Sequence, residues 1–344
     1  MGVNLSKASG KSAGGMVVSL DALGTLYRFR EPFPVQYRKM ARECGLKAEV
    51  DVDKLEKSFK SALNFYSTTF PNYGKGTLND PEAWWTKLVN RAFSEVVDGE
   101  KIPAELGPRL YEHFSSGAAY ELYPDAHEFL ELMRKFKIQY SAADGPMFLT
   151  GIITNSDPRV RRVLQSLNLR VGPSTQPHFS ASDQWETAMR EGFQLRTTGS
   201  VHMRTQWHEY YNAANDFDFL ATSYETGFEK PDPGIYQAAV RLAAPMPMSR
   251  AEQQMEEVKG QVTGVFKLAS TTLVHATQLA EMQWIHVGDD YIKDYRGAEG
   301  AGLEALHLVR EGEGEAKPGA KTVSSLEEVA AIVNVIAEES FAKA

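Results

Sequence analysis

Short apolar runs that end in polar residues recur along the chain. These runs occupy residues 16–18, 148–153, 217–223, 284–288 and 303–309. Between most of them, apolar residues return every three or four positions, as in segments 129–136, 235–242 and 325–338, which is typical of amphipathic helices. Parallel strands need crossover connections, and helices usually supply them. The pattern therefore predicts an α/β fold with a doubly wound, mainly parallel, Rossmann-like sheet.

Segment 32–115 has helical periodicity and almost no strand pattern. Leu55, Phe59 and Leu63 begin one apolar stripe, and a second stripe runs from Trp85 to Val96. We expect a helical cap domain that is inserted after the first strand. Between its helices lies a turn-rich loop, 70–76, which supplies Tyr73 and Lys75 as candidate substrate contacts, whereas Trp84 and Trp85 are expected to pack in the core of the cap.

The remaining segments divide around this insert. We expect a flexible leader at 1–15, an α/β core at 16–31 and 116–344, and surface insertions at about 170–215 and 245–282. His178, His202 and His208 fall in the first insertion and are interpreted as solvated, and a helix is expected near Met255 in the second. Gly2 and Ser6 fit a myristoylation pattern, which would give weak membrane contact.

Composition narrows the class of protein. A chain of 344 residues with 42% hydrophobic and 24% charged residues is typical of a soluble globular protein. The net charge of -8 argues against nucleic acid as a partner, because phosphate contacts need clustered Lys and Arg. A single cysteine, Cys44, excludes an intramolecular disulfide and fits a reducing compartment. With no apolar stretch long enough to span a membrane, we expect a cytoplasmic protein, with the nucleus or a membrane surface as alternatives.

Two of the predicted strands end in carboxylates. Asp21 follows the first strand, and Asp289, Asp290 and Asp294 follow the run at 284–288. In open α/β sheets the carboxyl ends of the strands form the ligand-binding edge. Two such ends side by side would form an anionic pocket suited to Mg²⁺ and to nucleophilic attack. Lys230 lies on a short, proline-stiffened loop beside the start of a predicted helix.

The polar residues occur in a recognisable order. Asp-x-x-Gly-Thr-Leu begins at Asp21, Thr154 and Asn155 follow a later strand, Lys230 lies in Gly-x-x-Lys-Pro-Asp-Pro, and Gly-Asp-Asp ends at Asp290. This series resembles the haloacid dehalogenase superfamily of hydrolases, in which a C1-type helical cap occupies the place of segment 32–115. The Phe-Pro-Asn-Tyr-Gly and Trp-Trp sequences of that segment resemble the eukaryotic haloacid dehalogenase-like hydrolase domain-containing subgroup.

The resemblance implies roles for these residues. Asp21 would be the nucleophile that forms a covalent aspartyl intermediate, and Lys230 would offset the negative charge of the transition state. Thr154 would donate a hydrogen bond to the transferred group, with Asn155 beside it. Mg²⁺ would be held by Asp21, the backbone carbonyl of Leu23 and Asp289, with Asp294 in support and Asp290 as a further candidate. Gly24 and Thr25, below the nucleophile, join Tyr73 and Lys75 as candidate substrate contacts.

One position departs from the phosphatase pattern. Phosphatases of this superfamily have a second Asp two residues after the nucleophile, where it protonates the leaving group, and this chain has Leu23. Haloacid dehalogenases also lack that Asp, because halide leaves without a proton. The acids at 289, 290 and 294 nevertheless favour a cation, since uncompensated carboxylates would repel one another. We therefore expect a Mg²⁺-dependent hydrolase of a small phosphorylated molecule, such as an acyl or aryl phosphate. A catalytically quiet binding protein and a 2-haloacid dehalogenase are the alternatives.

Overall fold

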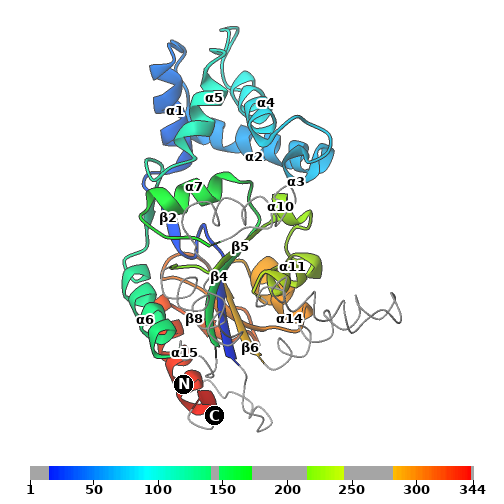
Figure 1. The fold of residues 1–344 in the computed structure, drawn as a ribbon. Helices are drawn as coiled ribbons and strands as arrows, with labels where there is room; N and C mark the ends of the chain where they lie inside the picture. Colours follow the sequence, from blue (N-terminus) through cyan, green and yellow to red (C-terminus); the bar gives the residue numbers. More distant parts are fainter. Residues whose placement is uncertain (1–14, 141–146, 173–214, 244–281, 342–344) are drawn as a thin grey trace, which may run out of the picture.

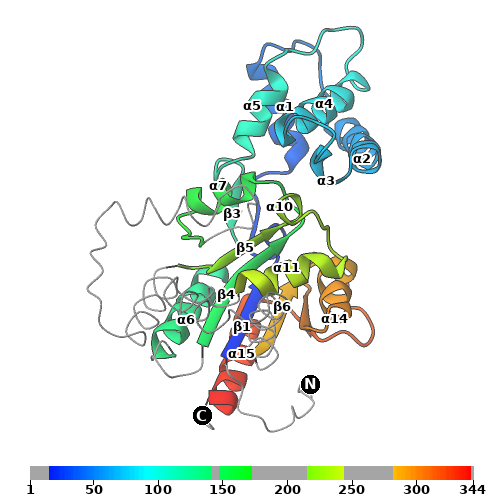
Figure 2. The ribbon, with the colours of Figure 1, turned by 45° about the vertical axis from the view of Figure 1, so that its right-hand side comes forward.

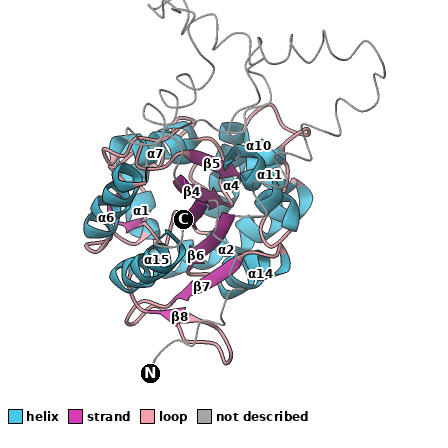
Figure 3. Cartoon of the chain, turned by 60° about the horizontal axis from the view of Figure 1, so that its bottom comes forward, coloured by secondary structure: helices cyan, strands magenta, loops and turns pink. Residues whose placement is uncertain are grey.

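The computed structural model describes residues 15–140, 147–172, 215–243 and 282–341. Its centre is a six-stranded parallel sheet with the order β5-β4-β1-β6-β7-β8 (Figure 3). The strands are β1 (Gly15–Leu20), β4 (Met147–Thr154), β5 (Phe219–Thr222), β6 (Met282–Gly288), β7 (Glu304–Leu308) and β8 (Thr322–Val323). The α/β fold class predicted from the sequence is confirmed.

The register of the central strands brings the predicted site residues to one edge. Leu20, the last residue of β1, pairs with Ile152 of β4 on one side and with Val287 of β6 on the other. Every residue of β1 is buried, as expected for a strand that is covered on both faces, and this explains its continuous apolar run. Because the strands are parallel, the polar residues that follow β1, β4 and β6 lie next to one another.

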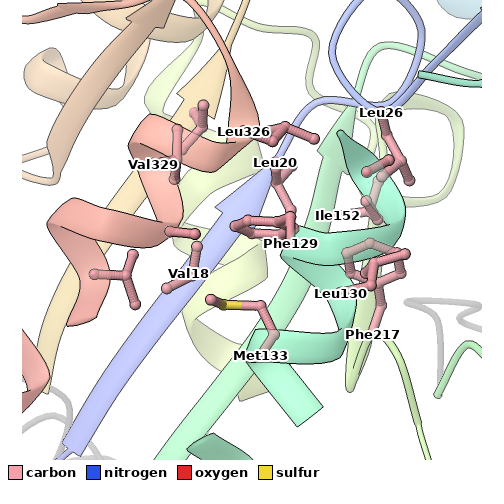
Figure 4. Packing of buried hydrophobic residues seen from close by; sticks show 14 of the residues in the cluster. Val18, Leu20, Leu26, Phe129, Leu130, Met133, Ile152, Phe217, Leu326 and Val329 are labelled. Atoms are coloured by element: carbon pink, nitrogen blue, oxygen red, sulfur yellow. The ribbon is translucent and has the colours of Figure 1, made fainter. Parts of the chain in front are cut away.

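Helices cover both faces of the sheet (Figure 3). On one face, α6 (Ala126–Gln139), α7 (Arg159–Ser166) and α15 (Leu326–Phe341) pack on an apolar cluster, in which Phe129 and Leu326 close around Val18 and Leu20 (Figure 4). On the other face lie α11 (Pro233–Ala243) and α14 (Gly297–Gly300), which pack on Val17 and Ile153. The short α10 (Ser223–Thr226) and a π-helix, η1 (Tyr291–Arg296), complete the core.

A helical module of residues 33–113 lies beyond the sheet (Figure 1). It consists of α1 (Phe33–Glu43), α2 (Val52–Thr69), α3 (Pro71–Gly74), α4 (Pro81–Ser94) and α5 (Leu106–His113). Asp51 and Asp80 begin α2 and α4 with side chains that accept backbone N–H groups, as N-cap residues do. The module has its own apolar core, in which Trp84 is 1% exposed. Trp84 therefore packs as predicted.

An antiparallel ribbon, which the sequence analysis did not predict, joins this module to the sheet domain. It pairs β2 (Tyr27–Phe29) with β3 (Tyr120–Leu122). Each strand has three residues, too few for a two-residue alternation to be recognised. The pairing places the entry and the exit of the helical module side by side, so both connections to the core are held together.

Some predicted boundaries shift, and others fall outside the described residues. Gly15 and Met282 belong to strands β1 and β6, and Val171 forms a bridge with Phe217. Gly2, the three histidines of the first insertion and the helix expected near Met255 lie outside the described ranges. Within those ranges, no helix combines the length and the apolar character that a membrane crossing requires.

Candidate active site

Lys230 lies at the centre of the edge formed by β1, β4 and β6. Its Nζ donates hydrogen bonds to Asp21 Oδ1 at 2.7 Å, to Asp294 Oδ1 at 2.6 Å and to the Ile153 carbonyl at 2.9 Å. The Lys230 side chain is 2% exposed and that of Asp21 is 13% exposed. A buried ammonium group is costly unless it is paired, and here three acceptors from three segments satisfy all three of its protons.

The backbone of Lys230 is fixed by the residue that follows β4. Asn155 Oδ1 accepts a hydrogen bond from the Lys230 N–H at 2.7 Å, and Asn155 Nδ2 donates to the Lys230 carbonyl at 3.0 Å. Two parallel hydrogen bonds allow one orientation of the two groups. Asn155 therefore sets the position from which the lysine reaches the carboxylates.

Three carboxylates converge beside this lysine. Oxygen atoms of Asp21, Asp289 and Asp294 all lie within 4.8 Å of one another. Thr25 Oγ1 donates a hydrogen bond to Asp289 Oδ1 at 2.9 Å. With all three acids ionised and Lys230 protonated, their charges sum to −2, since three negative charges meet one positive charge. A divalent cation would neutralise this arrangement.

The pKa values of these groups follow from burial and from their neighbours. Burial, and then the negative charges of Asp21 and Asp294, raise the pKa of Asp289 to about 7, although part of its side chain reaches solvent. Burial alone would raise the pKa of Asp294, but Lys230 and the hydrogen bond with His286 hold it well below its usual range. Burial would lower the pKa of Lys230, yet the charges of Asp21 and Asp294 raise it. Lys230 and Asp294 thus favour each other's charged forms, whereas Asp289 has no cationic partner among the described residues.

Glycines make room for two of the three acids. Gly24 has a φ of 91°, and a Cβ at this position would lie 2.5 Å from Asp289 Oδ2. A Cβ at Gly288 would lie 2.2 Å from the Cγ of Asp294. Both contacts are shorter than real Cβ atoms make. The glycines of the Asp-x-x-Gly-Thr-Leu and Gly-Asp-Asp sequences are therefore needed for the carboxylates to approach one another.

Comparison with known proteins finds relatives that cover most of the chain. The chain is 25% identical over 292 residues to haloacid dehalogenase-like hydrolase domain-containing protein 3 of Bos taurus, which covers 84% of this chain and 80% of that protein. It is 25% identical over 295 residues to the Homo sapiens protein of the same name, with 85% and 81% covered. No family model matches the chain.

Solved structures with the same fold include one from Bacillus subtilis. The magnesium-bound HAD-hydrolase YfnB from Bacillus subtilis superposes with a TM-score of 0.50 at 13% identity, over 93% of this chain and 99% of that one. These similarities support membership of the haloacid dehalogenase superfamily. Both relatives carry the name of the haloacid dehalogenase-like hydrolase domain-containing group, which the sequence also resembles.

The structure brings most of the superfamily's motif residues together. It leaves Asp290 outside the cluster of three carboxylates, which we call the carboxylate group. Asp290 accepts hydrogen bonds from the backbone N–H groups of Ile292 and Lys293 and pairs with Lys293 Nζ at 2.8 Å. It is therefore the N-cap of η1. Two adjacent acids thus have separate tasks, because one points to Asp21 and the other begins a helix.

Two further motif positions lie at the same edge. Thr154 ends β4 beside Thr222 and is 5% exposed, and the structure gives its hydroxyl no hydrogen bond to a described residue. Leu23 is 40% exposed in the turn after Asp21. The side chain at the position of the second Asp of superfamily phosphatases is therefore apolar and open to whatever occupies the site.

Tyr73 and Lys75, the candidate substrate contacts of the helical module, bond to the core in this structure. Tyr73 OH donates to the Asn155 carbonyl at 2.9 Å, and Lys75 Nζ donates to the carbonyls of Tyr224 and Glu225. Accordingly α3 lies against α10 (Figure 1 and Figure 2). A cleft of about 460 Å³ opens beside this contact, and its lining includes Lys75, Phe228, Glu229 and Asp232. Substrate contact by Tyr73 and Lys75 stays a prediction.

A second contact between module and core was missed by the sequence analysis. Trp85 Nε1 donates a hydrogen bond to Asp157 Oδ2 at 2.7 Å, and Arg159 pairs with Asp157 at 2.8 Å. The Arg159 guanidinium also lies over the rings of Trp85 and Tyr111. Trp85 was expected to pack in the cap, and its ring does pack there, but its N–H faces the core. The only sign of this contact in the sequence is the acid directly before Pro158, and an acid followed by proline is equally typical of a helix start.

Proposed function

We propose that the protein is a Mg²⁺-dependent hydrolase of phosphorylated small molecules that acts through an aspartyl intermediate on Asp21. The contact that carries this proposal is the Lys230–Asp21 ion pair within a group of three carboxylates. Lys230 occupies Asp21 Oδ1, and Asp21 Oδ2 accepts no hydrogen bond from the described residues. One oxygen is thus oriented by a cation while the other is available for attack.

The residues present fit a divalent cation. Asp21, Asp289 and Asp294, with the backbone carbonyl of Leu23, would hold Mg²⁺, because hard cations prefer oxygen ligands and the group has an unbalanced charge. Bound there, Mg²⁺ would offset charge on the phosphoryl oxygens and keep Asp289 ionised. The raised pKa of Asp289 supports this assignment, since an acid crowded by two others is stabilised by a cation.

The protein's own groups would divide the remaining work. Asp21 attacks phosphorus, and Lys230 offsets the charge that builds on the transferred group. The Thr154 hydroxyl, which makes no hydrogen bond to a described residue, would donate one to that group. Asn155 acts at one remove, by holding the backbone of Lys230. The helical module would serve as the cap that closes over these groups, with Tyr73 and Lys75 at its contact with the core.

Leu23 limits the leaving group. Loss of a general acid typically costs ~10² to 10⁴ in rate, so alkyl phosphates should react slowly. Aryl and acyl phosphates have leaving groups that need little protonation, and they are the substrates we propose. Leu23 also supports a second candidate, a 2-haloacid dehalogenase, because halide needs no proton. The three carboxylates favour phosphoryl hydrolysis over dehalogenation, since their combined negative charge calls for a cation.

Turnover of p-nitrophenyl phosphate and acetyl phosphate by the full-length protein, with Mg²⁺ or with EDTA, tests the proposal. We expect Mg²⁺-dependent turnover that is abolished in Asp21→Asn. Asp289→Asn and Asp290→Asn form a matched pair, because the two acids are adjacent and only the first belongs to the carboxylate group. We expect the Mg²⁺ requirement to change strongly in the first variant alone. Halide release from 2-chloropropionate without Mg²⁺, and no phosphate release, would support the dehalogenase instead.

A further inference from the structure

A chain of buried hydrogen bonds reaches the ion pair from inside the sheet. Trp284 Nε1 donates to Ser19 Oγ at 2.8 Å, Ser19 Oγ lies 2.9 Å from His286 Nδ1, and His286 Nε2 lies 3.4 Å from Asp294 Oδ1. Ser19 and His286 are paired residues of β1 and β6, and both are 0% exposed. Burying polar groups on a central strand costs folding free energy unless each group is hydrogen-bonded. This series of hydrogen bonds therefore needs an explanation beyond packing.

The direction of the hydrogen bonds can be worked out from the donor at the inner end. A Trp indole only donates, so Ser19 Oγ accepts from Trp284. The hydroxyl hydrogen of Ser19 then has one acceptor among its described partners, His286 Nδ1. If Nδ1 carried a proton instead, Ser19 would receive two donors and its own hydrogen would be buried without an acceptor. Nδ1 is therefore the unprotonated nitrogen.

The outer end of the chain requires the same tautomer. With Nδ1 unprotonated, the ring proton is on Nε2, which faces Asp294 Oδ1. The opposite tautomer would place a nitrogen lone pair against a carboxylate oxygen. The other oxygen of Asp294, Oδ2, accepts the backbone N–H of Asp290 at 3.0 Å. The carboxylate is thus held at both oxygens before Lys230 adds its bond to Oδ1 at 2.6 Å.

We propose that His286 is a positioning residue, which donates from Nε2 to Asp294 and so fixes the carboxylate that aligns Lys230 with Asp21. Ser19 and Trp284 select the tautomer that can do this. The catalytic consequence rests on the proposed function, whereas the tautomer does not. The Nε2–Oδ1 separation of 3.4 Å is the longest in the chain, so the contribution of His286 is orientation more than binding strength.

Nitrogen NMR tests the tautomer without any activity. In full-length protein labelled with ¹⁵N-histidine, the ring signals of His286 are assigned by their loss in His286→Gln. We expect the pattern of a neutral ring protonated at Nε2. A ring protonated at Nδ1, or at both nitrogens, would overturn the proposal whether or not the protein is an enzyme.

Kinetics with p-nitrophenyl phosphate and Mg²⁺ test the positioning role. His286→Phe keeps a ring of similar size but has no donor, and His286→Gln keeps an N–H at the place of Nε2. We expect kcat to fall ~10- to 100-fold in the Phe variant, with KM within about twofold, and the Gln variant to recover most of the loss. Equal kcat in the two variants would contradict the role of the donor.

A third variant covers the case in which the Phe variant does not fold. Ser19→Ala leaves His286 in place but removes the partner of Nδ1, and we expect a smaller fall in kcat with KM unchanged. Unaltered kcat in a folded Ser19→Ala protein would show that the inner chain does not position the site. Absence of turnover in the wild type would refute the proposed function and would leave the NMR result to decide the tautomer.

Discussion

Gly24 offers a sharp test of how the carboxylate group is built. At this position a Cβ would lie 2.5 Å from Asp289 Oδ2, whereas ordinary contacts begin at 3.4 Å. In Gly24→Ala, Asp289 must therefore retreat by about 0.9 Å, the difference between these two distances. A misplacement of about 1 Å in an active site costs on the order of 10²-fold in rate. We expect that loss in kcat/KM, and a weaker Mg²⁺ dependence.

The chain contains a matched control. Gly45 has a φ of 90°, almost the same as the 91° of Gly24, and a Cβ there would meet nothing within 4 Å. Both alanine variants pay for a left-handed backbone, about 1–2 kcal/mol of folding free energy. The difference between them isolates the contact with Asp289.

Thermal unfolding and p-nitrophenyl phosphate turnover over a series of Mg²⁺ concentrations would measure the two effects. Similar losses of stability, with activity lost only in Gly24→Ala, are expected. If Gly24→Ala keeps the activity of Gly45→Ala, Asp289 is not part of the working site, and the assignment of the cation to these three acids is wrong.

Three further outcomes are expected. Leu23→Asp should raise turnover of alkyl phosphates by ~10²-fold or more while Leu23→Asn does not, and equal rates in the two would contradict the missing-acid argument. In urea unfolding with EDTA present, the wild type should lose stability as the pH rises from about 4 to 7. The reason is that the folded protein holds a proton on Asp289 that the unfolded chain releases. This dependence on pH should be absent in Asp289→Asn and suppressed by Mg²⁺. Trp85→Phe, which loses the hydrogen bond to Asp157, should raise KM, whereas Trp84→Phe, whose N–H bonds to Phe70 within the module, should reduce stability alone.

The sequence predicted the site where the signals were local. Asp21 and Asp289 each follow a buried strand directly, and parallel strands bring such ends together, so their proximity followed from the fold class. Lys230 was predicted from a short loop before a helix. The contacts of these residues could not be predicted in the same way. That Asn155 holds the backbone of Lys230 depends on side-chain directions across 75 positions of sequence.

Asp289 and Asp290 show why sequence patterns stop short of geometry. The two acids are adjacent and chemically identical, and either could have faced Asp21. The structure separates them because η1 begins at Tyr291 and needs an acceptor for its first N–H groups, which Asp290 supplies. The turn after β6 then directs Asp289 toward Thr25. A helix start, and not the chemistry of the site, decides which acid joins the group.

The different burial of the two carboxylates that pair with Lys230 bears on the choice between a hydrolase and a binding protein. If these ion pairs served stability alone, a buried lysine between two carboxylates would contribute little, because desolvation offsets much of the attraction in such pairs. Here Lys230 satisfies Asp294, which is 1% exposed, and still reaches Asp21, which solvent can approach. The buried acid thus anchors the lysine, and the partly open acid receives its charge at one oxygen only. That asymmetry leaves Asp21 Oδ2 without a hydrogen bond from the described residues, as the proposed attack on phosphorus would require.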